Sequence, residues 1–142
     1  MSYLPADTPF PPPEPWEQPF WDFCGRRELR FQSCARCGVI RHPPMPVCAT
    51  CHALESAWLE ADSDVELFTY TVVHHPNHPA LEASTPYNAA LVIFPRMQGV
   101  RLVTNIVDCA NPDLRIGMPL SLVWEEPVPG RVLPRFRPRG RP

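Results

Sequence analysis

Five stretches between residues 58 and 125 place apolar residues in the alternating or continuous runs that are typical of short β-strands. The predicted strands are Trp58–Ala61, Val65–His74, Ala89–Phe94, Val100–Val107 and Pro119–Glu125. Turns separate them at Asp62-Ser63-Asp64 and Gln98-Gly99, and longer connections follow His75 and Asn111. Five successive strands of this size favour a five-stranded OB-fold barrel and a mostly β protein. A β-sandwich would show the same alternation, so it stays as the alternative architecture.

The front of the chain has a different pattern. Prolines are dense over residues 1–15, where they interrupt helices and strand ladders alike, so we expect an arm without regular structure. Phe20, Phe23 and Cys24 then recur at helical spacing, which predicts a short helix within residues 16–27. The aromatic residues of this segment are Trp16, Phe20, Trp21 and Phe23. They either pack on the protein's own core or anchor a partner.

Two Cys-x-x-Cys pairs, separated by ten residues, lie between the helix and the predicted barrel. They are Cys34, Cys37, Cys48 and Cys51. The alternating segment Glu28–Gln32 leads into the first pair and Val39–His42 returns from it, which predicts a small ribbon. Gly38 suits the tight turn after the first pair, whereas His52 stands at the equivalent place after the second, so we expect the second turn to be less regular.

Four thiolates at this spacing complete a tetrahedral shell around one zinc ion. The shell has no open position for water, so the zinc is predicted to be structural and not catalytic. Iron in a rubredoxin-like site is the chemical alternative. Two disulfides would need an oxidising compartment. Neither a secretory leader nor a run of about 18 apolar residues is visible. We therefore expect a cytoplasmic protein without a membrane span.

These patterns divide the chain into four parts. They are an arm with a short helix (1–27), a zinc ribbon (28–57), an OB-fold barrel (58–126) and an Arg/Pro-rich C-terminal tail (127–142). A hydrophobic content of 44% is enough for a packed core. The net charge is -2, and all basic residues are arginine. Because phosphate binding needs a basic field, this balance argues against a general nucleic-acid binder.

The remaining candidates have simpler interpretations. His74, His75 and His78 could bind metal or transfer protons, but a polar loop beside prolines explains them. The acidic residues Asp62 and Asp64, with Glu60 and Glu66, fit a solvated turn. Cys24 and Cys109 fit small core positions. The arginines at 131, 135, 137, 139 and 141 form either a solvated tail or a contact for phosphate or carboxylate groups. No residue is predicted to be catalytic, and no site for an organic cofactor is identified.

Several motifs are specific when taken together. Around the ribbon they are Phe20-Trp21, Leu29-Arg30-Phe31-Gln32-Ser33-Cys34, Cys34-Ala35-Arg36-Cys37-Gly38, Pro43-Pro44, Cys48-Ala49-Thr50-Cys51 and Trp58. Farther on they are Phe68-Thr69-Tyr70-Thr71-Val72-Val73-His74, Pro86-Tyr87, Gly99-Val100-Arg101-Leu102, Asn105-Ile106-Val107-Asp108, Leu114-Arg115-Ile116-Gly117-Met118-Pro119-Leu120 and Leu133-Pro134-Arg135-Phe136-Arg137-Pro138. The sequence from about residue 20 to 138 resembles the bacterial and archaeal OB-fold proteins with a rubredoxin-like zinc ribbon, which are associated with acyl-CoA. That family often has a glycine-rich turn where this chain has Asp62-Ser63-Asp64, so nothing functional is carried over there.

The resemblance implies a non-catalytic accessory subunit that binds a thiolase-fold enzyme of the lipid-transfer-protein type. The enzyme would act on CoA thioesters, as a retro-aldolase of steroid side-chain degradation does, with the acyl-CoA site formed at the interface. A two-fold partner dimer predicts a heterotetramer with two copies of each chain, with Phe136 and the aromatic helix as anchors. Two alternatives stay open: a partner of a hot-dog-fold enoyl-CoA hydratase, and a zinc-ribbon and OB protein that binds single-stranded nucleic acid.

Overall fold

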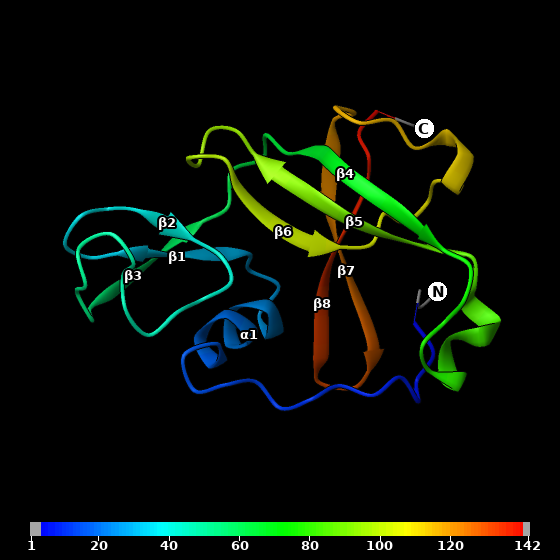
Figure 1. Ribbon diagram of the computed structural model, residues 1–142, viewed down its shortest axis with the longest axis horizontal. Coiled ribbons are helices and arrows are strands. Elements are labelled where there is room, and N and C mark those ends of the chain that lie inside the picture. Colours follow the sequence, from blue (N-terminus) through cyan, green and yellow to red (C-terminus); the bar gives the residue numbers. More distant parts are fainter. Residues whose placement is uncertain (1–3, 141–142) are drawn as a thin grey trace.

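The computed structural model describes residues 4–140 as one helix and eight strands, with two short 3₁₀ turns. The elements are α1 (Gln18–Gly25), β1 (Arg30–Cys34), β2 (Ile40–Arg41), β3 (Ser56–Glu60), β4 (Glu66–Val73), η1 (Pro79–Ser84), β5 (Tyr87–Phe94), β6 (Val100–Thr104), η2 (Asn111–Asp113), β7 (Leu120–Val128) and β8 (Arg131–Pro138). The predicted helix and the mostly β class are confirmed. Figure 1 shows the ribbon strands β1–β3 at one end of the molecule, the barrel strands at the other, and α1 between them. Within the described residues, no helix is long and apolar enough to cross a membrane.

The ribbon is a three-stranded antiparallel sheet in the order β2-β1-β3. Gln32 in the central strand faces Arg41 on one side and Trp58 on the other. The segment Trp58–Ala61 was predicted to be the first barrel strand, and this is wrong: β3 pairs along its whole length with β1. Its alternating residues indicate a strand, but the choice between two sheets depends on long-range pairing that periodicity does not encode.

The barrel is built from β4-β5-β6 and from the hairpin β7-β8. One edge closes through Leu67 N–H to Met118 O (3.1 Å) and Leu120 N–H to Val65 O (2.9 Å), which join β4 to the start of β7. The other edge closes where the Thr104 hydroxyl donates to Pro134 O (2.9 Å), joining β6 to β8. The order β4-β5-β6-β8-β7, returning to β4, confirms the five-stranded OB-fold barrel.

The fifth barrel strand is β8, in a segment that was predicted to be an Arg/Pro-rich C-terminal tail outside the barrel. That prediction is wrong for residues 131–138, which pair with β7 from Val128↔Arg131 to Leu120↔Pro138. Alternating arginine and proline concealed the strand, because proline is depleted in strands and arginine favours solvent. The apolar residues between them, including Val132, Leu133 and Phe136, are buried.

A chain of aromatic rings connects the ribbon sheet with both sheets of the barrel through the core. Phe31 of β1 meets Phe94 of β5 edge to face at 4.9 Å, and Phe94 meets Phe136 of β8 at 6.1 Å. Phe20 of α1 is also buried, so neither Phe20 nor Phe136 is the partner anchor that the sequence suggested. Of the predicted anchors, Trp16 has the most open side chain, at 38% exposure.

Candidate zinc centre and an adjacent pocket

The two cysteine pairs lie on turns with the same hydrogen bonds. In the first turn, Gly38 N–H donates to Cys34 O (3.0 Å) and Cys34 N–H donates to Val39 O (2.9 Å). In the second turn, His52 N–H donates to Cys48 O (2.9 Å) and Cys48 N–H donates to Ala53 O (3.0 Å). The expectation of a less regular second turn is therefore wrong. His52 takes the left-handed conformation (φ 61°) that Gly38 takes at φ 77°, although this region disfavours residues with a side chain.

The turns bring the four predicted cysteines together, with all sulfur atoms within 4.8 Å of one another. The Sγ atoms of Cys34 and Cys51 are 3.5 Å apart, and those of Cys37 and Cys48 are 3.7 Å apart. Tetrahedral zinc with bonds of about 2.3 Å to sulfur would hold sulfurs about 3.8 Å apart. The donor set and its spacing therefore fit one zinc ion with a closed shell.

Backbone amides favour the thiolate form at this cluster. The N–H groups of Cys37 and Arg36 point at Cys34 Sγ, each at 3.4 Å, and they lower the pKa of Cys34 to about 6. In the second turn, the backbone N–H of Cys51 lowers the pKa of Cys48 in the same way. Because the thiolate is the metal ligand, the turns prepare Cys34 and Cys48 for zinc before it binds. At Cys37 the Val39 backbone N–H acts in the same direction, but burial and the neighbouring cysteine side chains outweigh it and raise the pKa to about 11.

The other candidates from the sequence do not gather around a site. His74, His75 and His78 are all exposed, and His78 Nδ1 accepts from Ala80 N–H (3.1 Å) to cap η1. Asp62 Oδ1 accepts from Asp64 N–H (2.7 Å), a local turn contact. Across residues 4–140, the four cysteines are the group of three or more potential ligands that lies close enough to share an ion.

The C-terminal arginines contact the protein itself. Arg131 lies over the Phe10 ring at 4.6 Å, Arg135 forms a buried ion pair with Glu125 at 3.0 Å, and Arg137 is 3.8 Å from Asp108. Arg139 donates to Ser63 O. Arg141 lies outside the described residues. The sequence left a solvated tail and a contact for phosphate or carboxylate groups as alternatives, and the structure pairs Arg135 and Arg137 with carboxylates of the same chain.

The two remaining cysteines differ in environment. Cys24 is fully buried in α1, and burial raises its pKa to about 12, so its thiol is neutral and inert, as expected for a core position. Cys109 is half-buried and packs at the edge of the core.

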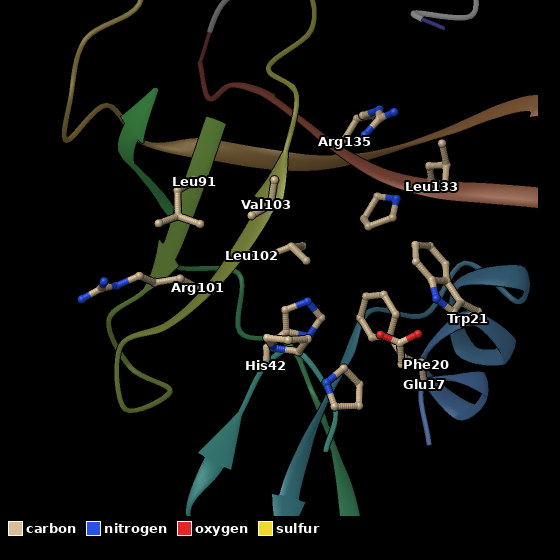
Figure 2. Close-up of a pocket in the computed structure, with 13 residues that line it drawn as sticks. Glu17, Phe20, Trp21, His42, Leu91, Arg101, Leu102, Val103, Leu133 and Arg135 are labelled. Atoms are coloured by element: carbon tan, nitrogen blue, oxygen red, sulfur yellow. The ribbon is translucent and has the colours of Figure 1, made fainter. Parts of the chain in front are cut away.

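Beside the ribbon lies a pocket of about 390 Å³ that the sequence did not indicate. Its walls come from α1, from the segment after β2, and from β5, β6 and β8. Figure 2 shows Phe20 and His42 close together near its centre, with Trp21 beyond Phe20 and Arg101 extending away on the opposite side. His42 stands alone before Pro43 and Pro44, so no repeating pattern in the sequence marks it as a pocket residue.

Comparison with known proteins places these features in a family. The model for the ChsH2 rubredoxin-like zinc ribbon domain matches residues 21–55, and the model for the ChsH2 C-terminal OB-fold domain matches residues 58–125. A chain in the solved structure of the Ltp2-ChsH2(DUF35) aldolase superposes with a TM-score of 0.81 at 40% identity, covering 91% of this chain and 98% of that chain. The chain belongs to the ChsH2/DUF35 family. Its zinc is therefore structural, held in a rubredoxin-like ribbon.

Other relatives of this ChsH2/DUF35 chain have different names. A protein of Thermomonospora curvata, called a probable enoyl-CoA hydratase alpha subunit, is 43% identical over 120 residues, which are 84% of this chain and 36% of that protein. A DUF35 domain-containing scaffold protein of Methanocaldococcus jannaschii is 29% identical over 92 residues. This chain thus spans about a third of the first relative and just under two thirds (63%) of the second.

A solved DUF35-family protein of Sulfolobus solfataricus shares the fold at 19% identity, with a TM-score of 0.62 over 87% of this chain and 85% of that one.

Proposed function

We propose that this chain is a non-catalytic scaffold subunit that binds a thiolase-fold aldolase acting on CoA thioesters and helps to form its acyl-CoA site. The observation that carries the proposal is the likeness to a chain of the Ltp2-ChsH2(DUF35) aldolase, which covers 98% of that chain at 40% identity. The second curated relative is itself named a scaffold protein. The assembly would contain two copies of each chain around the partner's two-fold axis.

The metal chemistry supports a role without turnover. We infer that Cys34, Cys37, Cys48 and Cys51 are the zinc ligands, and four thiolates leave no coordination position for water or substrate. Zinc would therefore hold the ribbon in shape, and the chemistry of carbon–carbon cleavage would belong to the partner.

The outer face of the barrel offers a surface for that partner. Val103 of β6 is 73% exposed and is paired across the sheet with Leu91 of β5. An outward position on an antiparallel sheet usually carries a polar residue, and the strands β5 and β6 correspond to the second and third strands that OB folds use for binding. We infer that the Leu91/Val103 pair lies in the interface.

Co-expression with a thiolase-fold aldolase of the Ltp2 type tests the proposal. The two chains should elute together, with a mass by light scattering that equals two copies of each. The complex, and not the isolated chain, should cleave a β-hydroxyacyl-CoA by retro-aldol reaction. A soluble chain that fails to bind this protein would contradict the proposal, and so would robust turnover by the isolated chain.

Two matched variants locate the interface. Val103→Glu places a charge on the barrel face, whereas Leu54→Glu does the same at an equally exposed position, 69%, beside the cysteine turns. Val103→Glu should weaken the complex by at least tenfold, and Leu54→Glu should leave it unchanged. The reverse result would move the interface to the ribbon.

A hydratase complex is the second candidate, because the relative from Thermomonospora curvata carries that name. It predicts binding to a hot-dog-fold hydratase and hydration of an enoyl-CoA. Pull-down of both enzymes with the same tagged chain, followed by both assays, distinguishes the two functions.

A further inference from the structure

The pocket between α1 and the barrel has mostly apolar walls and a single neutral polar group near its centre. Phe20 and Trp21 come from α1, Leu102 from β6 and Leu133 from β8. Its volume of about 390 Å³ is in the range of small-molecule sites, which are usually apolar with a few placed polar groups. The scaffold role alone does not account for a cavity of this kind, so the pocket could hold a ligand of its own.

His42 packs against two aromatic rings. Its imidazole lies 4.9 Å from the Phe20 ring and 5.5 Å from the Phe31 ring. Nδ1 is buried and has no hydrogen-bond partner among the described residues. A buried N–H without an acceptor is rarer than an unfilled acceptor, so the proton belongs on Nε2. Burial also lowers the pKa of His42 to about 4, which keeps the ring neutral near pH 7. Nε2–H is thus a donor available to an occupant of the pocket.

The charged groups nearby do not favour an anion. Arg135 is engaged by the buried carboxylate of Glu125 at 3.0 Å, and Arg101 lies over the Phe68 ring at 4.1 Å. Glu17 contributes a negative charge to the lining, and its Oε2 accepts from Glu14 N–H at 2.9 Å. Arg101 keeps its charge, but its side chain extends away from the pocket (Figure 2), so a carboxylate or phosphate inside would meet the negative charge of Glu17 without a cation directed at it. A neutral molecule therefore fits better.

We propose that this pocket binds an uncharged, ring-sized apolar molecule whose carbonyl oxygen accepts a hydrogen bond from His42 Nε2–H. The aromatic and aliphatic walls would enclose the hydrocarbon, and the single donor would fix its orientation. Leu91 and Val103 also line the pocket, so it opens beside the surface proposed for the partner. The test below uses the chain alone, so its failure would leave the scaffold role untouched.

The test uses 1-indanone as a probe and indane as its matched partner without the oxygen. Both are titrated into the full-length, zinc-loaded, ¹⁵N-labelled chain, and binding is followed at the Trp21 indole and His42 imidazole signals. Because one hydrogen bond contributes modestly in water, 1-indanone should bind about three- to tenfold more tightly than indane. Only the ketone should shift the His42 Nε2 resonance.

His42→Phe keeps a ring in place and removes the donor, so the two probes should then bind equally. His75→Phe, at an exposed histidine, should bind both as the wild type does. The proposal is overturned by equal affinities in the wild type, by a ketone preference that survives His42→Phe, or by an unchanged Trp21 signal. If His42→Phe does not fold, the comparison of the two probes and the Nε2 shift in the wild type decide alone.

Discussion

The ribbon and the barrel are stabilised by different means, although strand β1 contributes to both. At one end of β1, Phe31 is buried in the large apolar core. At the other end, Cys34 belongs to a cluster whose buried members are Cys34, Cys48 and Ala53. A cluster this small buries too little surface to offset the entropy of ordering the ribbon. The ribbon therefore depends on metal bonds and the barrel on packing.

The largest effect on this contrast is expected from removing one of the proposed zinc ligands. Cys34→Ser should lose zinc and destabilise or precipitate the protein, because structural zinc sites contribute on the order of 10 kcal/mol to folding. Zinc content by mass spectrometry and solubility measure the effect. Cys109→Ser, at a half-buried cysteine outside the cluster, should keep full zinc. A folded wild-type protein without zinc would refute this account of the ribbon.

The barrel should respond to lost packing instead. Phe94 is 1% exposed and touches both Phe31 and Phe136, so Phe94→Ala should lower the free energy of unfolding by about 4 kcal/mol. Zinc content should not change in the folded variant. Urea unfolding measures the loss. Phe68→Ala, at a ring that is 36% exposed, serves as the control and should cost less than about 1 kcal/mol. Similar losses at both positions would mean that the core is not centred on Phe94.

Among the ion pairs of the described residues, Arg135–Glu125 is the one with both side chains buried. Arg135 and Glu125 have side chains 9% and 7% exposed, and Leu4 N–H also donates to the carboxylate at 2.9 Å. Arg135→Met removes the guanidinium that pairs with this buried carboxylate and should cost about 3 kcal/mol. Adding Glu125→Leu should restore most of that loss.

A matched arginine on the same strand checks the role of burial. Arg137 forms a pair with Asp108 at 3.8 Å, but the side chains are 55% and 68% exposed. Arg137→Met should change the free energy of unfolding by less than about 1 kcal/mol. If Arg135→Met and Arg137→Met lower the free energy of unfolding in urea by the same amount, burial does not set the strength of the Glu125–Arg135 pair.

The contrast also explains which features the sequence predicted. The cysteine cluster follows from local spacing, because each turn is closed by bonds between residues four or five apart. The barrel needed long-range information. The strand Ser56–Glu60 alternates like a barrel strand but pairs with β1, and Arg131–Pro138 resembles a tail but completes the barrel. His42 was missed for the same reason, since only the packing of α1 against the sheets makes its environment apolar.

An effect smaller than that of Arg135→Met is expected at the junction of the two regions, where His42 follows β2 and contacts α1. Burial lowers its pKa from 6.5 to about 4, so between these values the unfolded chain binds a proton that the folded chain does not. The stability that His42 contributes is complete above about pH 6.5 and is lost as the pH falls toward 4. The loss amounts to about 2 kcal/mol by pH 5.

Carboxylates also titrate in this range, so the measurement is the difference in urea unfolding between wild type and His42→Phe from pH 7.5 to 5. The wild type should lose more stability on acidification than the variant, while His75→Gln, at an exposed ring, should follow the wild type. Parallel pH profiles for wild type and His42→Phe would show that the ring takes up its proton in the folded protein as readily as in water. The junction would then be open to solvent, and the tautomer assigned to the pocket would lose its basis.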